Sequence, residues 1–261
     1  MPEAVTWCLS QARDDRRSWH NRDILTKTSL LASVAATVVL VSAALFPASA
    51  QAADAGLPVS MDDPGSATTQ LITVRAKEWK DRTGVIDWWQ KKSDGKWTHV
   101  GSAKARFGSK GLVRGKNRRQ YTHTTPSGIY KIPLAFGTVA GTNVKVRFRP
   151  ITSKSYWCQD NKSARYNRWV ERRPMKNCRA SHAEHLADYA KQYKRALVIG
   201  YNWKQTPKRG AGIFLHVNGK AYTAGCISTN GTTMKKLLRW IDGEQSPRIA
   251  IGLFDRHIKA Y

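Results

Sequence analysis

A long uncharged run near the start of the chain constrains what the rest can become. Leu30–Phe46 consists almost entirely of Ala, Val, Leu and Ser, and a polar segment containing five Arg and Lys residues precedes it. Two small-x-small sequences, Ala48-Ser49-Ala50 and Ala50-Gln51-Ala52, follow directly. This order is typical of a secretory signal peptide. The sequence therefore predicts a signal peptide at residues 1–52 and a secreted, extracytoplasmic mature chain.

The alternative for this run is a retained membrane anchor, because its seventeen residues approach the length that crosses a bilayer. The cleavage sequences favour removal, which leaves no stable membrane span. Residues 53–70 are rich in Gly, Pro, Ser and Asp and are predicted to be a flexible leader. Residues 71–261 then suit one domain with a sizeable core, and we expect a monomer.

The chain is strongly basic, with 44 Lys and Arg against 18 Asp and Glu, a net charge of +26. Removing residues 1–52 takes away five of the bases and four of the acids, which leaves +25. A field of this size concentrates polyanions near the surface. Anionic cell-wall polymers are therefore expected partners, with no specific nucleic acid. A solvated surface that keeps the chain soluble is the alternative.

The four cysteines are Cys8, Cys158, Cys178 and Cys226. Cys8 leaves with the signal peptide, so an odd number remains outside the cell. A disulfide between Cys158 and Cys178 is expected, because it would close a polar loop and stabilise the fold by roughly 3 kcal/mol. Pairing of either one with Cys226 is the alternative, and it would remove the thiol. The spacings of a metal site are absent from the sequence, so no metal and no cofactor are expected.

Alternating and short apolar runs predict a strand-rich domain. One hairpin is expected around Ser93-Asp94-Gly95. Helices are expected after the capping-box sequence Ser181–Glu184 and around Met234–Ile241, where apolar residues have helical spacing. The predicted strands are 71–74, 85–89, 97–100, 143–151, 196–199, 213–217 and 248–254.

The strand-like run Ile213–Val217 contains His216, and Cys226 follows ten residues later, directly after Gly225. A cysteine becomes a nucleophile as its thiolate, and a nearby imidazole lowers the thiol pKa and accepts the proton. Gly225 permits a tight turn whose N–H groups could hold an oxyanion. Both side chains could instead be ordinary core residues. The spacing nevertheless suggests a nucleophile with its base.

The sequence FLHV…TAGCIS at residues 214–228 resembles the signature of the YkuD-type L,D-transpeptidase family, in its branch with a short His-to-Cys connection. Thr125–Tyr130, TPSGIY, is similar to a second element of that domain, and the resemblance covers about residues 71–261. It implies a mostly-β, sandwich-like catalytic domain with two or three helices packed against it. It also implies a cysteine acyl-enzyme on the third residue of a peptidoglycan tetrapeptide stem, with release of the terminal D-alanine.

By this resemblance Cys226 is the nucleophile and His216 its general base. Gly225 and the backbone amide of Cys226 would belong to the oxyanion site, with Thr223 at the family's Ser/Thr position. An amine from a neighbouring stem completes transpeptidation, whereas water would make the protein a carboxypeptidase or endopeptidase on the same stems.

Two residues depart from the family pattern. Ala224 stands where the best-known members carry a second histidine, and Ser228 stands where they carry Arg or Asn. We still expect Ser228 in the cleft, and we expect His123, Thr125 and Gly128 on the substrate side.

A different class of function rests on the charge and on the stretch DWWQKKSDGKW at residues 87–97. Tryptophans interleaved with lysines can form a stacking platform for sugars or single-stranded nucleic acid. They can equally form a strand with an aromatic core face and solvated lysines. The alternative function is therefore a cationic wall- or nucleic-acid-binding protein without chemistry.

Overall fold

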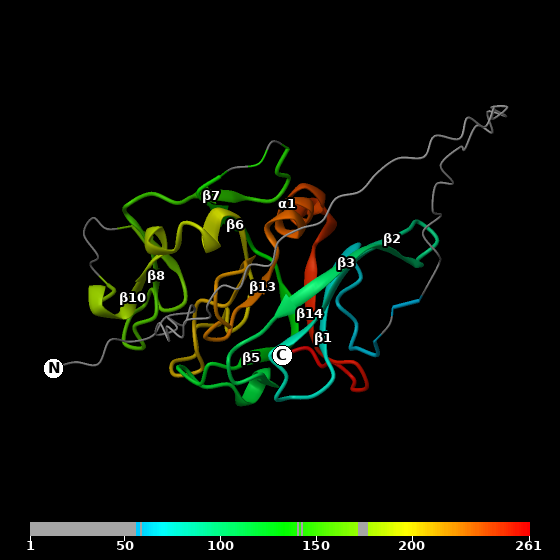
Figure 1. The fold of residues 1–261 in the computed structure, drawn as a ribbon, viewed down its shortest axis with the longest axis horizontal. Helices are drawn as coiled ribbons and strands as arrows, with labels where there is room; N and C mark the ends of the chain where they lie inside the picture. Colours follow the sequence, from blue (N-terminus) through cyan, green and yellow to red (C-terminus); the bar gives the residue numbers. More distant parts are fainter. Residues whose placement is uncertain (1–55, 58, 140, 142, 172–176) are drawn as a thin grey trace, which may run out of the picture. The chain divides into compact units, whose positions relative to one another are not determined.

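The computed structural model describes residues 56–57, 59–139, 141, 143–171 and 177–261, and the fold is that of these residues (Figure 1). The predicted signal peptide lies outside the described residues. No helix within the described ranges is both long enough and apolar enough to cross a membrane.

Strands are the main regular structure of the described residues, as predicted, and they form a large and a small sheet (Figure 1). In the large sheet the order is β4-β5-β14-β1-β2-β3-β13-β12-β11-β6-β7, and in the small sheet it is β10-β8-β9. The strands of the large sheet are β1 Gln70–Ala76, β2 Thr83–Lys91, β3 Trp97–Arg106, β4 Leu112–Arg114, β5 Thr125–Lys131, β6 Ala135–Gly137, β7 Phe148–Pro150, β11 Ala196–Val198, β12 Phe214–Val217, β13 Ile227–Thr229 and β14 Arg248–Leu253. Those of the small sheet are β8 Ser155–Cys158, β9 Trp169–Glu171 and β10 Ala183–His185.

The predicted hairpin around Ser93–Gly95 is confirmed as β2 and β3, which pair antiparallel from Thr83 to Lys91. Trp88 and Trp89 are both buried and belong to separate core clusters. Successive side chains of a strand point to opposite faces, so core covers both sides of β2 here. These two tryptophans therefore pack inside the protein, as the second interpretation of the Trp-rich stretch requires.

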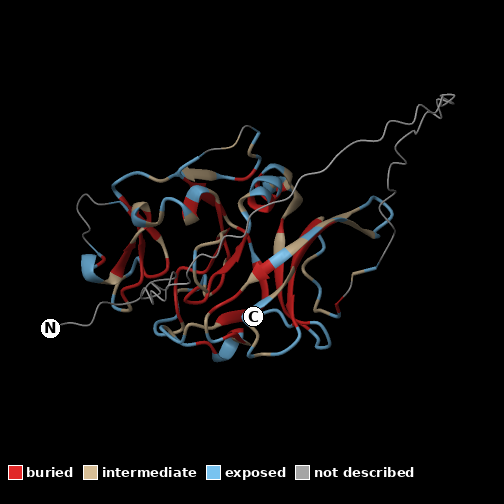
Figure 2. Cartoon of the chain, in the orientation of Figure 1, coloured by how far each residue is buried: buried red, intermediate tan, exposed pale blue. Residues whose placement is uncertain are grey.

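The helix predicted around Met234 is confirmed as α1, Gly231–Trp240. Its N-cap is Asn230, whose side chain accepts a hydrogen bond from the amide of Thr233. Met234, Leu237 and Leu238 are buried in the main core, which gives the apolar face its helical spacing. In Figure 2 the buried residues lie mainly on the central strands, and exposed residues lie in the connecting loops, along the β2–β3 hairpin and on α1.

The helix predicted after residue 181 is wrong. The segment forms the short 3₁₀ turns Ala180–His182, Leu186–Tyr189 and Gln192–Lys194, with β10 between the first two. Ser181 bonds to the ring of His182, and the Glu184 side chain is buried against Gln159 and Tyr193, so neither caps a helix. Pairing of β10 with β8 overrides the local helical preference.

Two other expectations also differ from the structure. The strand predicted over 143–151 is limited to β7, where Phe148–Pro150 pair with β6, and Lys145 forms only an isolated bridge with Asp242. The leader predicted to be flexible is packed in its described part. Val59 joins a core cluster that includes Leu71, and Asp62 lies 2.7 Å from Nε2 of His257 near the end of the chain.

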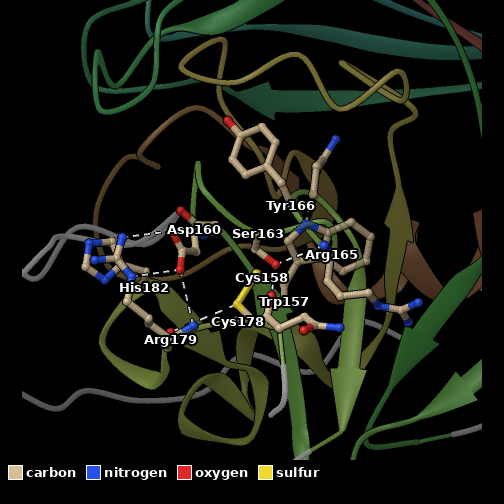
Figure 3. Close-up of a disulfide and its surroundings, with 12 residues drawn as sticks. Trp157, Cys158, Asp160, Ser163, Arg165, Tyr166, Cys178, Arg179 and His182 are labelled. Atoms are coloured by element: carbon tan, nitrogen blue, oxygen red, sulfur yellow. Dashed lines mark hydrogen bonds and ion pairs between the residues drawn. A yellow bond between two sulfur atoms is a disulfide. The ribbon is translucent and has the colours of Figure 1, made fainter.

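The predicted disulfide between Cys158 and Cys178 is present, with the two Cα atoms 6.1 Å apart (Figure 3). It excludes both alternative pairings with Cys226. Beside it, Nε and Nη2 of Arg179 each lie 2.8 Å from one carboxylate oxygen of Asp160. The hydrogen bonds from Arg179 hold the pKa of Asp160 well below its usual range. Disulfide and ion pair together fasten the loop that follows β8.

Candidate active site

Parallel pairing of β12 and β13 brings the histidine and the cysteine to one place. His216 lies opposite Ser228 in this ladder, and Cys226 directly precedes β13. Residues two apart on a strand share a face, so Cys226 shares the face of Ser228 and hence of His216. Both side chains lie in one buried region, because Cys226 belongs to the same core cluster as Tyr193, and the ring centroids of Tyr193 and His216 are 5.5 Å apart.

The sulfur of Cys226 is fully buried between backbone groups. Its Sγ lies 3.4 Å from the carbonyl oxygen of Gly212 and 3.3 Å from the amide nitrogen of Phe214. None of the cysteines in the described part of the chain is a free thiol, so the predicted unpaired thiol at Cys226 is not found in this structure. Any thiol chemistry therefore belongs to the reduced form of this residue.

The imidazole of His216 has the tautomer that a base needs. Nδ1 lies 2.8 Å from the carbonyl oxygen of Val217, which can only accept, so Nδ1 carries the proton. Nε2 then presents a lone pair, and it has no hydrogen-bond partner among the described residues. The backbone of Val217 thus plays the orienting role that a carboxylate plays in other Cys–His and Ser–His sites.

Burial lowers the pKa of His216 to about 4, and the hydrogen bond to Val217 opposes this only in part. The ring is therefore neutral at pH 7. A lone imidazolium here would lose its hydration without compensation. With a thiol at Cys226, the resting pair is accordingly neutral, and charges separate only when the proton moves.

The turn that carries Cys226 is fixed by Thr223. Its Oγ1 donates to the carbonyl oxygen of Cys226 at 2.6 Å and accepts from the amide of Gly225 at 3.2 Å. Gly225 has φ +131°, a conformation that strongly favours glycine. The Gly225 N–H, which we expected to help hold an oxyanion, donates to Thr223 in this structure.

The upstream TPSG element reaches this turn through its first residue only. Oγ1 of Thr125 accepts from the amide of Gly108 at 2.9 Å and lies 3.4 Å from the carbonyl oxygen of Cys226. Gly128 pairs with Ile251 of β14, and a side chain there would meet the ring of Tyr130. Its role as a substrate-binding residue stays a prediction.

The two remaining predicted residues flank the pair. His123 approaches Gly108 with its backbone, and burial, followed by the charges of Arg118 and Lys110, lowers its pKa. Ser228 is fully buried opposite His216, and its hydroxyl has no hydrogen-bond partner among the described residues. Ser228 therefore adjoins the base and does not line an open cleft.

A buried carboxyl, missed by the sequence reasoning, supports the base indirectly. Glu184 accepts from the hydroxyl of Tyr193 at 2.5 Å and from Nε2 of Gln159 at 3.0 Å. Burial raises its pKa to about 7 despite these hydrogen bonds. The ring of Tyr193 packs edge-on against His216. Glu184 thus fixes the wall against which the imidazole rests.

The second missed residue is Arg118, which lies buried beside Gly225. In the sequence it is one basic residue within KNRRQ, and no periodicity or motif separates it from its neighbours. Only the folded chain shows that this guanidinium approaches Gly225, directly before Cys226.

A separate groove of about 1080 Å³ lies between the β2–β3 hairpin and the loop that follows β12. Its cationic walls are Lys77, Lys104, Arg106 and Lys220, with Asp81 as the acidic residue. Neither His216 nor Cys226 lines it. Within the described residues there is no cluster of three potential metal ligands from His, Cys, Asp and Glu.

These features define a mostly-β, disulfide-bonded domain with buried His216 on β12 and buried Cys226 directly before β13, the adjacent parallel strand. No protein-family model matches the chain, and neither does a curated protein or a solved structure.

Proposed function

We propose that the mature chain is an exported cysteine acyltransferase of the L,D-transpeptidase type that acts on peptidoglycan tetrapeptide stems in the cell wall. One observation carries the proposal. Nε2 of His216 is an unprotonated acceptor on the same sheet face as Cys226, with its tautomer fixed by Val217. The resemblance of FLHV…TAGCIS and TPSGIY to the YkuD-type family supplies the substrate.

The first half-reaction uses the reduced form of Cys226. Its S–H proton passes to Nε2 of His216 as the sulfur attacks the carbonyl carbon of the third stem residue. The C–N bond to the terminal D-alanine then breaks, and the departing amine takes the proton from His216. A thioester between Cys226 and the stem results, and free D-alanine leaves.

The second half-reaction returns the thiol. An amine of a neighbouring stem attacks the thioester carbonyl carbon and loses a proton to His216, and the sulfur leaves and regains that proton. Because Cys226 and His216 are each 0% exposed, a stem reaches them only when the residues covering them move. Water in place of the amine would make the protein a carboxypeptidase or endopeptidase.

A non-catalytic wall-binding function is the second candidate, and the basic groove favours it. Four Lys and Arg side chains against one Asp line that groove, and the mature chain has a net charge of +25 from the counts above. An anionic wall polymer fits this charge, and binding of this kind would also hold the enzyme on its substrate. Neither role requires a cofactor.

The test begins with the redox state of Cys226 in the chain 53–261. Alkylation followed by peptide mass mapping should label Cys226 after mild reduction. The reduced chain, incubated with tetrapeptide-stem muropeptides, should release D-alanine and form a cross-linked or hydrolysed product by mass. Cys226→Ser and His216→Gln should each lose at least about 1000-fold in rate, since each removes a reacting group.

Two controls make this result specific. A Cys158→Ser/Cys178→Ser variant shows whether reduction acts through the other disulfide, and it should keep the D-alanine release. A Thr69→Ala variant, far from the pair in sequence and directly before β1, should be unchanged. The proposal fails if the reduced chain releases no D-alanine or if Cys226→Ser releases it equally well.

A further inference from the structure

Arg118 is a buried cation with no counter-charge among the described residues. The residue is 3% exposed and follows the 3₁₀ turn Gly115–Asn117. Its Nε donates to the carbonyl oxygen of Thr124 at 2.9 Å, and its Nη1 to that of Arg209 at 3.3 Å. Both acceptors are neutral, and no carboxylate of the described residues forms an ion pair with the guanidinium. Burial lowers the pKa of Arg118 accordingly.

The backbone around this guanidinium is shaped to leave room for it. A side chain at Gly210 would overlap Nη1, and the Cβ of a side chain at Gly225 would lie 2.8 Å from Nη2. The φ angle is +106° at Gly210 and +131° at Gly225. The ring of Tyr201 lies 5.6 Å from the guanidinium carbon. Nη2 is therefore directed at the residue immediately before Cys226.

Stability alone does not account for this arrangement. Arginine is almost never fully buried unless it is paired, because removing its charge from water is costly. The ion pair at Arg75 and Asp87 shows the usual solution in this same protein, with both side chains buried and 2.8 Å between Nη2 and Oδ2. A buried guanidinium that lacks such a partner and sits beside a candidate nucleophile is suited to an anionic ligand.

We propose that Arg118 binds the terminal carboxylate of the acyl-donor peptide, beside the turn that carries Cys226. This inference rests on the proposed function and names a contact to its substrate. The donor stem ends one residue beyond the bond that is cleaved, so its carboxylate lies near the reacting carbonyl. A guanidinium recognises a carboxylate through two parallel N–H···O bonds, which a lysine does not reproduce.

The experiment measures binding without turnover, in a Cys226→Ala chain spanning 53–261. Two probes are compared by calorimetry, a synthetic tetrapeptide stem ending in D-alanine and the same peptide amidated at its carboxyl terminus. With Arg118 present, the amide should bind about 10- to 100-fold more weakly than the acid, as expected for loss of a charged hydrogen-bonded pair. Arg118→Gln should bind acid and amide alike, and Arg118→Lys should discriminate only partly.

The matched control is Arg114→Gln, which removes the same charge from an exposed residue of β4 and should discriminate like the parent chain. If Arg118→Gln fails to fold, the comparison of acid and amide binding by the parent chain still tests the inference. Equal binding of acid and amide, binding of neither, or discrimination that survives in a folded Arg118→Gln chain overturns the inference. If the chain discriminates acid from amide but the reduced chain releases no D-alanine, the carboxylate site stands and the proposed enzymatic function fails. If it releases D-alanine without discriminating, the enzymatic function stands and the carboxylate site fails.

Discussion

Two buried titratable side chains meet across the ring of Tyr193. Its hydroxyl donates to Glu184, and its ring edge packs against His216. Burial acts on both in the same sense, because it favours the neutral form of each. It raises the pKa of Glu184 to about 7 and lowers that of His216 to about 4. Near neutral pH the wall of the site therefore gains a negative charge while the base stays neutral.

Replacing Glu184 by Gln should flatten the pH dependence of stability. The folded pKa of about 7 lies above the unperturbed value of 4.5, so the stabilising contribution of the protonated carboxyl is complete below pH 4.5. It is lost as the pH rises through 7, by about 3 kcal/mol at 1.36 kcal/mol per pKa unit. Urea unfolding of the parent and of Glu184→Gln, at intervals from pH 4.5 to 8, should give curves that diverge by about this amount.

The difference between the two curves is the readout, because His216 contributes in the opposite direction. Its folded pKa of about 4 lies below 6.5, so its contribution is lost as the pH falls from 6.5 towards 4, in both proteins. Glu244→Gln, at an exposed position in the turn before β14, should track the parent. A Glu184→Gln curve that runs parallel to the parent would show that this carboxyl ionises as readily folded as unfolded.

At the scale of residues, the sequence predicts the pair His216 and Cys226 but not the buried residues near it. The ten-residue spacing between His216 and Cys226 is enough to anticipate that a strand, a turn and a return bring them together. Thr125 reaches the turn because it begins β5, whereas Gly128, three residues along the same strand, is carried to the far partner β14. Arg118 and Glu184 come from distant segments, and nothing in their local sequence marks them as buried.

At the scale of secondary-structure elements, apolar periodicity predicts an element correctly where one face of it is buried. It fails where pairing with another strand determines the structure. α1 follows its apolar spacing, and the β2–β3 hairpin follows its turn residues. The segment after Ser181 reads as a capped helix, yet Ala183–His185 pairs with β8. The partner strand lies some 25 residues away in the chain, so local periodicity does not indicate this pairing.

Loss of the disulfide between Cys158 and Cys178 should destabilise the fold. The bond joins residues 20 apart in the sequence, and closing a loop of that size is worth roughly 3 kcal/mol in the chain-entropy model. A Cys158→Ala/Cys178→Ala variant should therefore lose about this much of its free energy of unfolding in urea. Because the bidentate contact of Arg179 with Asp160 persists, the loop should stay docked in the folded state.

The matched control for this measurement is Asp160→Asn, which weakens the ion pair and leaves the disulfide in place. If the two changes hold the same loop, the triple variant should lose less than the sum of the separate losses. A double-alanine variant as stable as the parent would show that the unfolded chain is already confined without the bond.

At the scale of the whole molecule, the net charge can be counted from the sequence, whereas the fold decides where the charged side chains gather. The net charge of +26 on the chain repels itself and attracts polyanions wherever the surface concentrates it. One concave place where basic residues gather is the groove of about 1080 Å³ that is lined by Lys77, Lys104, Arg106 and Lys220. That convergence could not be read from the sequence, because these residues come from β1–β2, β3 and the loop after β12.

Reversing charge in this groove should weaken binding to a polyanion more than the same change elsewhere. Lys104→Glu/Lys220→Glu is expected to lower the affinity for inorganic polyphosphate about tenfold at low salt, and the effect should shrink above about 0.5 M salt as screening removes it. Lys96→Glu/Lys191→Glu makes the same change in net charge at exposed positions outside the groove. If both double variants bind polyphosphate equally weakly, the overall charge causes the attraction and the groove is not a binding site. If only the groove variant binds more weakly, the polyanion binds between β3 and the loop after β12, apart from the buried His–Cys pair.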